Sequence, residues 1–218
     1  ATVDMFVGML AVLLPVVRET YSLSLTLGVV LLSAQSLACN GVQLLIGHLR
    51  ADKKTPLLIS VGLALATLFC FLGLIPQQAS SVVWVFVLTI ISGIGVAFFH
   101  PEGLRAVHHL KDIPPATSSS VFLTAGFAGT SCGSWFASVL VFHWGLKGLL
   151  LLTPLPALLW GVFKKLNIQL AVEPTDPNDT AREPANPFSI WSLYAMMVPA
   201  GTASMMTLCL LPTRLHEL

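Results

Sequence analysis

The sequence VVWVFVLTIISGIGVAFFHPEGL, residues 82–104, is an apolar run that carries a histidine, a proline and a glutamate close to its end. A helix needs about 20 mainly apolar residues to cross a bilayer, and its backbone must satisfy its own hydrogen bonds there. The run therefore predicts a membrane-spanning helix with ionisable side chains near one end.

Six further apolar segments accompany this run. They are Val3–Val17, Leu25–Leu49, Pro56–Ile75, Val121–Phe142, Leu149–Phe163 and Ile190–Pro212. Only 10% of the 218 residues are charged, whereas soluble domains carry about 25%. The alternation that a transmembrane β-barrel requires is missing. The sequence thus predicts an all-α integral membrane protein with six helices plus a seventh transmembrane helix.

The distribution of lysine and arginine predicts the orientation, because these residues accumulate in short cytoplasmic loops. With the amino terminus in the cytoplasm, the cytoplasmic set is Arg50, Lys53, Lys54, Arg105, Lys111, Lys164, Lys165 and Arg182, and the opposite set is Arg18, Lys147 and Arg214. We therefore expect a multi-pass protein of the cell membrane, of the bacterial inner-membrane type. The formal net charge of +1 reflects topology and lipid contacts and does not indicate a nucleic-acid partner.

A polar, proline-rich stretch interrupts the apolar segments at residues 164–188 and is typical of a linker. We expect residues 1–163 to form an amino-terminal six-helix bundle. Residues 189–218 would then hold the first helix of a carboxy-terminal bundle whose other helices the sequence lacks. The first segment starts with neither a methionine nor a signal-peptide pattern, and we interpret it as a genuine span whose start is trimmed. Because the chain stops just beyond the seventh segment, we interpret it as a fragment that needs this bundle or a partner subunit.

Asp4 lies inside the first apolar segment, where a charged side chain costs roughly 3 kcal/mol unless it faces a cavity or a partner. It shares a helix face with Gly8, Ala11 and Pro15, whose small side chains permit close helix contact. Asp4 is therefore a proton-coupling candidate. The alternative is a hydrated Asp4 near the membrane surface.

The second and fifth segments carry stripes of polar or small residues. The stripe of the second segment is Ser36, Asn40, Gln43 and Gly47, and that of the fifth is Gly126, Gly129 and Gly133. Helical spacing turns the polar stripe toward other helices or water, so Ser36, Asn40 and Gln43 are candidates for the wall of a substrate cavity. Hydrogen bonding between helices is the alternative, and the glycines predict tight packing.

His100, Glu102 and Arg105 lie within one and a half turns at a membrane boundary. Histidine titrates near neutrality and partial burial raises the pKa of a glutamate, so these residues are candidates for a proton relay. The spacing of Glu102 and Arg105 also permits an ion pair. The alternative is an interfacial salt bridge that closes this end of the protein.

The sequence carries no pattern for a metal, a cofactor or an enzyme. His108 and His109 lack the spacing of metal ligands, and the cysteines lack paired spacing. The serine run of residues 118–120 has no nearby base in the sequence, and no glycine-rich phosphate loop precedes a lysine. We expect no cofactor and no enzymatic activity, with an intramembrane enzyme as the remotest hypothesis.

The chain resembles the major facilitator superfamily, and within it the branch of the fosmidomycin resistance proteins. Four stretches carry the resemblance: Asp4–Gly8 with Leu13–Pro15 and Leu23–Leu25; the loop of Gly47, Asp52 and Lys53; Phe99–Glu102; and Leu210–Pro212. The resemblance implies a six-helix bundle built from two three-helix repeats. It also implies that Gly47, Asp52 and Lys53 form a cytoplasmic gate, although this loop has one extra residue and lacks the later glycine and base of the superfamily pattern.

The resemblance implies a secondary transporter that works by alternating access. We expect an antiporter for proton-coupled efflux, which exports a small organic compound across the lipid bilayer. Drug antiporters of the superfamily often carry an arginine near the position of Thr89, so Asp4, His100 or Glu102 would have to couple protons here. The alternatives are a non-transporting assembly or interaction protein, or a half-transporter that functions as a homodimer.

Overall fold

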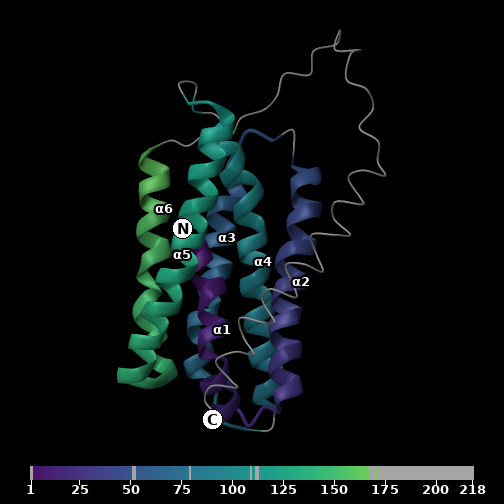
Figure 1. Cartoon of the computed structure of the whole chain (residues 1–218), viewed down its shortest axis with the longest axis vertical. Helices are drawn as coiled ribbons and strands as arrows, with labels where there is room; N and C mark the ends of the chain where they lie inside the picture. Colours follow the sequence, from purple (N-terminus) through teal and green to yellow (C-terminus); the bar gives the residue numbers. More distant parts are fainter. Residues whose placement is uncertain are drawn as a thin grey trace.

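The computed structural model describes residues 2–50, 53–78, 80–108, 110, 113–166 and 170, and their regular structure is helical (Figure 1). The α-helices are α1 (Thr2–Thr20), α2 (Leu25–Leu49), α3 (Leu57–Thr67), α4 (Ser81–His108), α5 (Pro115–Trp144) and α6 (Pro154–Lys165). The 3₁₀ segment η1 (Leu68–Leu74) continues α3, and a second 3₁₀ segment, η2 (Gly145–Leu152), lies between α5 and α6. The long helices run side by side as an elongated bundle.

Four stretches of the described chain are long and apolar enough to cross a membrane. They are Leu25–Leu49, Leu57–Leu74, Ser81–His108 and the continuous helical run Pro115–Lys165. The regular structure of the described residues is thus all-helical, with several helices that can span a membrane, but six separate spans plus a seventh are not established. The linker and the segment Ile190–Pro212 lie outside the described residues.

The structure extends the helices beyond the apolar segments at several ends. The fourth segment was expected to end at Leu104, and α4 continues to His108 with Pro101 inside the helix. The fifth was expected to begin at Val121, but α5 begins at Pro115, a residue type that fits the first turn of a helix because its missing N–H has no partner there. The polar last turn of α4 and the polar first turn of α5 are therefore helical, although hydropathy alone places them outside the membrane-spanning segments.

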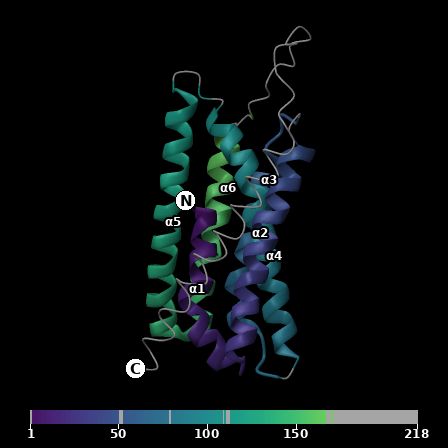
Figure 2. The same ribbon diagram turned by 45° about the vertical axis from the view of Figure 1, so that its right-hand side comes forward.

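The described helices pack as two groups. α1 packs chiefly against α5, whereas α4 packs chiefly against α2 and α3, and direct contact between α1 and α4 is sparse. Figure 2 shows α1 and α5 on one side of the bundle and α2, α3 and α4 on the other. Contact at the seam between α1 and α4 is therefore sparse, whereas η1 packs closely on η2 and joins the two groups.

Glycines bring the helix backbones together inside each group. A methyl group added to Gly133 of α5 would clash with the backbone of Met5 in α1, and one added to Gly8 would clash with the Thr130 carbonyl. In the other group, a methyl group on Gly95 of α4 would clash with the backbone of α3. The close packing predicted for the glycines of the fifth segment is confirmed at Gly133.

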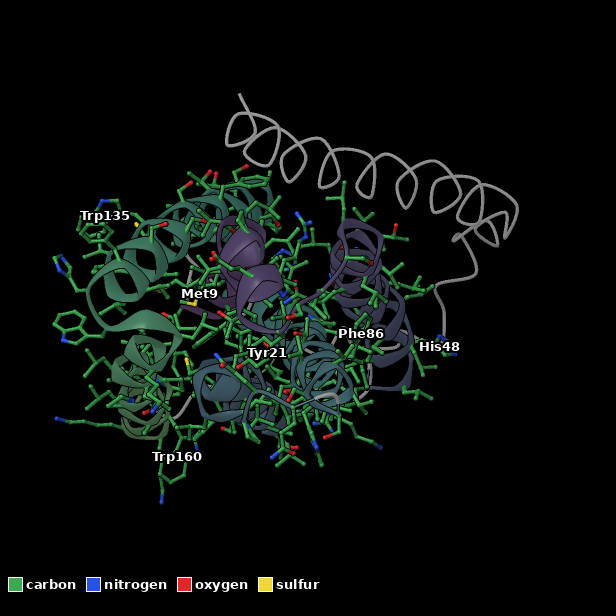
Figure 3. The ribbon with its side chains drawn as sticks, turned by 90° about the horizontal axis from the view of Figure 1, so that it is seen from below. Met9, Tyr21, His48, Phe86, Trp135 and Trp160 are labelled. Atoms are coloured by element: carbon green, nitrogen blue, oxygen red, sulfur yellow. The ribbon has the colours of Figure 1, made fainter. Side chains whose placement is uncertain are left out.

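Large apolar side chains separate into a core and an outer surface. Phe6, Met9, Leu10 and Leu14 of α1 are buried among the other helices. Figure 3 shows Met9 and Tyr21 inside the bundle, while Trp135 and Trp160 lie at its edge. Exposed aromatic rings on membrane-spanning helices are compatible with a surface that faces lipid, because a helix satisfies its backbone hydrogen bonds internally.

Candidate functional site

Asp4 of α1 and His100 of α4 form an ion pair across the seam. The Oδ1 atom of Asp4 lies 2.9 Å from Nε2 of His100, and the two side chains are 13% and 21% exposed. Since α-helices rise about 1.5 Å per residue, His100 lies roughly 12 Å along α4 from its end at His108. Two candidates that are distant in sequence thus meet inside an apolar stretch.

The other nitrogen of His100 determines how this contact can form. Nδ1 lies 2.9 Å from the Val96 carbonyl oxygen. A carbonyl only accepts hydrogen bonds, so Nδ1 carries a hydrogen, and Nε2 of a neutral ring then carries a lone pair. Nε2 and a carboxylate oxygen repel each other at 2.9 Å unless a proton lies between them. The observed geometry therefore requires one proton shared by Asp4 and His100.

The pair lies where four helices meet. The position that a Cβ atom would take at Gly126 of α5 is 3.5 Å from Oδ2 of Asp4, and the Phe122 ring of α5 contacts the His100 ring edge to face at 6.1 Å. Cys39 of α2 is close enough for its thiol to interact with the charge of Asp4. Small and apolar neighbours thus face the ion pair on α2 and α5, and the amino-terminal charge of the chain also acts on Asp4.

Glu102 lies one half-turn beyond His100 and is held differently. It is 1% exposed, and its Oε1 accepts a hydrogen bond from Nε of Arg50 at 2.5 Å. Its Oε2 accepts from the backbone N–H groups of Leu58 at 2.8 Å and Ile59 at 3.1 Å. These N–H groups belong to the first turn of α3, where helix donors lack partners within the helix. Glu102 therefore caps α3 from another helix.

The ion pair that the spacing allowed between Glu102 and Arg105 is replaced by the pair with Arg50. Arg105 instead donates to the carbonyl oxygens of Arg50 at 2.7 Å and Lys53 at 2.6 Å. Arg50 also donates to the Thr55 carbonyl at 2.8 Å. The two arginines thus hold the loop between α2 and α3 over the end of α4.

The predicted gate residues are only partly described. Gly47 lies beside Pro101 of α4, and Lys53 is exposed. Asp52 lies outside the described residues. Gly47 belongs to the last turns of α2, and Lys53 belongs to the loop that Arg50 and Arg105 hold.

The predicted cavity residues of α2 stay near the surface of the described bundle. Asn40 is exposed and donates to the Ser36 carbonyl at 2.9 Å within the same helix, while Gln43 is half-buried. A shallow pocket of about 370 Å³ lies on α5. Its lining residues are Ser120, Val121, Thr124, Ala125 and Ala128. No sequence pattern predicts this pocket beyond the small residues of α5.

Sequence reasoning missed two polar features. His108 Nε2 lies 2.7 Å from the Ser119 hydroxyl, so the serine run does have a neighbouring base, which comes from α4. Gln35 and Thr89 are buried, and neither Nε2 of Gln35 nor Oγ1 of Thr89 has a hydrogen-bond partner within the described part of the chain. Among the residues that the structure describes, no cluster of three metal-ligating side chains occurs.

Comparison with known proteins gives one family. The Major Facilitator Superfamily, a superfamily of membrane transporters, matches residues 1–215. Comparisons with curated proteins and with solved structures gave no match. The family match covers nearly the whole chain and agrees with its long apolar helices. The chain is therefore a multi-pass membrane protein that belongs to the Major Facilitator Superfamily.

Proposed function

We propose that this chain is the amino-terminal part of a secondary transporter that couples proton movement to the export of a small organic compound. The observation that carries the proposal is the 2.9 Å contact between Asp4 and His100 inside an apolar stretch, from which we infer a shared proton. An ionisable pair in a membrane is costly and marks a functional path for ions or substrate. Family membership supports the transport role, and the paired titratable groups support protons as the coupling ion.

The proposed mechanism is alternating access, in which protonation and substrate occupancy favour opposite-facing states. Asp4 and His100 bind and release the proton. Ser36, Asn40 and Gln43 of α2 contribute one wall of the substrate cavity. A second bundle, from the missing part of the protein or from a partner subunit, contributes the other wall.

Glu102 and Arg105 are assigned to the cytoplasmic gate rather than to proton transfer. Three donors occupy the Glu102 carboxylate, so both of its oxygens are engaged in holding α2 and α3. Gly47 near the end of α2, with Asp52 and Lys53 after it in the sequence, is assigned to the same gate. We also propose that the amino terminus lies in the cytoplasm and that the protein resides in the bacterial inner membrane. Within the superfamily, we assign it to the branch of the fosmidomycin resistance proteins. The proposed division of the chain is an amino-terminal bundle (residues 1–163), a cytoplasmic linker (164–188) and the first helix of a second bundle (189–218).

The test measures proton movement in liposomes that contain the full-length protein and a trapped pH dye. Fosmidomycin and a panel of small organic antimicrobials serve as probes under an imposed pH gradient. We expect at least one probe to move protons with wild type, and Asp4→Asn to remove this flux because its amide does not exchange a proton in the working range.

Ser134→Ala is the matched control, since it removes a hydroxyl bonded to Gly8 at 3.0 Å on the same helix pair without changing a titratable group. Probe flux that ignores the proton gradient would contradict coupling. Absence of flux for every probe, together with self-association in membranes, would favour the non-transporting assembly protein.

A further inference from the structure

We propose that ordered water lies between α2 and α4, bound by Gln35 and Thr89, and that protons reach the Asp4–His100 pair through this water. The inference rests on the proposed function and deepens it, since it names the route of the coupling proton. The bound water itself is a property of the folded bundle and is measured without transport.

The first step is the burial of two polar groups without partners. Gln35 of α2 is 4% exposed and Thr89 of α4 is 0% exposed. Among the described residues, neither Nε2 of Gln35 nor Oγ1 of Thr89 has a hydrogen-bond partner. Both lie in helices that are long and apolar enough to span a membrane, where an unpaired amide or hydroxyl is costly. Internal water is the usual partner of such buried groups.

The second step is the convergence of these groups, because α2 and α4 run in the same direction. A Cβ atom at Gly93 of α4 would lie 3.3 Å from Cγ of Gln35, and further along both helices Gly47 lies beside Pro101. Thr89 precedes Gly93 by one turn and shares its face of α4. Helix side chains lean toward the amino-terminal end of their helix, which directs Gln35 from Gly93 toward Thr89. The amide and the hydroxyl thus face the same part of the interface.

The third step is the continuity between this site and the Asp4–His100 pair. Thr89 and His100 lie on one face of α4, because about three helical turns separate them. On α2, Cys39 follows Gln35 by one turn, and its thiol is close enough to interact with the charge of Asp4. From the level of Gln35 to His100 is roughly 10 Å along α4 at about 1.5 Å per residue. A file of about three hydrogen-bonded waters spans this distance.

The fourth step is the closure of the bundle on the other side of the pair. Glu102 is 1% exposed and bonds to Arg50 and to the first turn of α3. The Phe122 ring of α5 contacts the His100 ring edge to face. The competing route runs over the exposed edge of the pair, since the Asp4 and His100 side chains are 13% and 21% exposed. The experiment below separates the two routes.

The first measurement locates the water by X-ray radiolytic footprinting of the full-length protein in liposomes. Hydroxyl radicals formed from a bound water oxidise the side chains beside it. Leu31 and Val85, both 0% exposed, lie one turn before Gln35 and Thr89 and serve as reporters. Phe69 of η1, also 0% exposed, is the dry reference, because its ring reacts more readily than an aliphatic side chain. We expect oxidation of Leu31 and Val85 but not of Phe69.

The second measurement repeats the footprint and the probe-driven proton flux on a variant that combines Gln35→Leu with Thr89→Val. This variant removes both unpartnered groups with little change in shape. We expect oxidation of Leu31 and Val85 to fall to the level of Phe69, and proton flux to fall several-fold. The unfolding temperature should not fall, because no hydrogen bond between described groups is lost.

Thr67→Val is the matched control, since the hydroxyl of this buried threonine donates to the Leu63 carbonyl at 2.7 Å within α3. It removes a hydroxyl that already has a partner, so both the footprint and the proton flux should stay as in wild type. Thr89→Val alone repeats the test should the double variant fail to fold.

Wild-type Leu31 and Val85 as unreactive as Phe69 would overturn the bound water. Oxidation that the double variant abolishes without any change in proton flux would leave the water in place and overturn the route, so that protons would reach the pair over its exposed edge. Absence of proton-linked flux in wild type would overturn the proposed function and the route with it, while the footprint alone would still decide the bound water.

Discussion

Glu102 of α4 and Arg50 at the end of α2 are joined by a 2.5 Å hydrogen bond between Oε1 and Nε, although 52 residues separate them in the chain. The second carboxylate oxygen of Glu102 is occupied by the first turn of α3. One buried carboxylate therefore connects three helices. This connection explains why an acidic residue is tolerated at a position that is 1% exposed.

Glu102→Gln should lower the free energy of unfolding by about 2 to 4 kcal/mol. Removing one partner of a buried ion pair costs about 3 to 5 kcal/mol, and the partial exposure of Arg50 reduces this cost. The measurement is thermal unfolding of the purified full-length protein in detergent. Lys54→Gln, at an exposed position of the same region, is the control and should change stability by less than about 0.5 kcal/mol. Equal unfolding temperatures for both variants would show that Glu102 does not stabilise the gate.

Gly133→Ala should destabilise the protein by about 1 to 3 kcal/mol, as expected for overpacking. The added methyl group meets the backbone of Met5, which has no rotamer to change. Gly161→Ala is the matched control, because a methyl group there meets no atom within 4 Å. Unfolding in detergent compares the two alanine variants, and a Gly133→Ala protein as stable as Gly161→Ala would refute close packing of α1 on α5.

Tyr21→Phe should cost about 1 kcal/mol at neutral pH, since the buried phenol donates to the Leu72 carbonyl at 2.5 Å. The Leu72 carbonyl also accepts from Ile75 at 3.2 Å, which limits the cost.

Burial raises the pKa of Tyr21 above its ordinary 10.0, so the folded protein keeps the phenol proton where the unfolded chain loses it. The contribution of this group is therefore complete below pH 10.0 and is lost as the pH rises above that value. Unfolding measured from neutral to strongly alkaline pH should show wild type losing its advantage over Tyr21→Phe. Parallel stability curves would contradict this coupling.

Ser119 should not react with a fluorophosphonate probe, although His108 lies 2.7 Å from its hydroxyl. A serine nucleophile needs a base that is itself oriented by a third group and donors for an oxyanion. Among the described residues, no hydrogen bond to Nδ1 of His108 occurs. Labelling of purified protein, with Ser119→Ala as the control, checks this result, and a label that Ser119→Ala abolishes would revive the hypothesis of an enzyme.

The helices were predictable from the sequence because hydropathy and length are local properties of the chain. The second segment, Leu25–Leu49, matches α2 at both ends. The third was expected to be one helix to Ile75, but α3 passes into 3₁₀ geometry at Leu68. Hydropathy does not distinguish the α-helical from the 3₁₀ hydrogen-bond pattern, so the sequence did not predict the change at Leu68.

The candidate site was predictable as a set of residues but not as an arrangement. The cost of charge in an apolar segment singled out Asp4, and the local cluster singled out His100 and Glu102. Their partners depend on how far each helix is shifted along its axis relative to its neighbours, and no local sequence pattern encodes this shift. For this reason His100 was grouped with Glu102, whereas in the structure it pairs with Asp4 and Glu102 pairs with Arg50.

The cap that Glu102 places on α3 has a consequence for biogenesis. Leu58 receives its acceptor from a residue 44 positions later in the chain. While the ribosome is still synthesising α4, the first turn of α3 therefore lacks this acceptor, and Pro56 at the N-cap supplies no side-chain substitute. The α2–α3 hairpin enters the membrane with an unfinished end, and arrival of α4 completes it. Newly made protein truncated before Glu102 should consequently be a better substrate for membrane proteases than protein truncated just after α4.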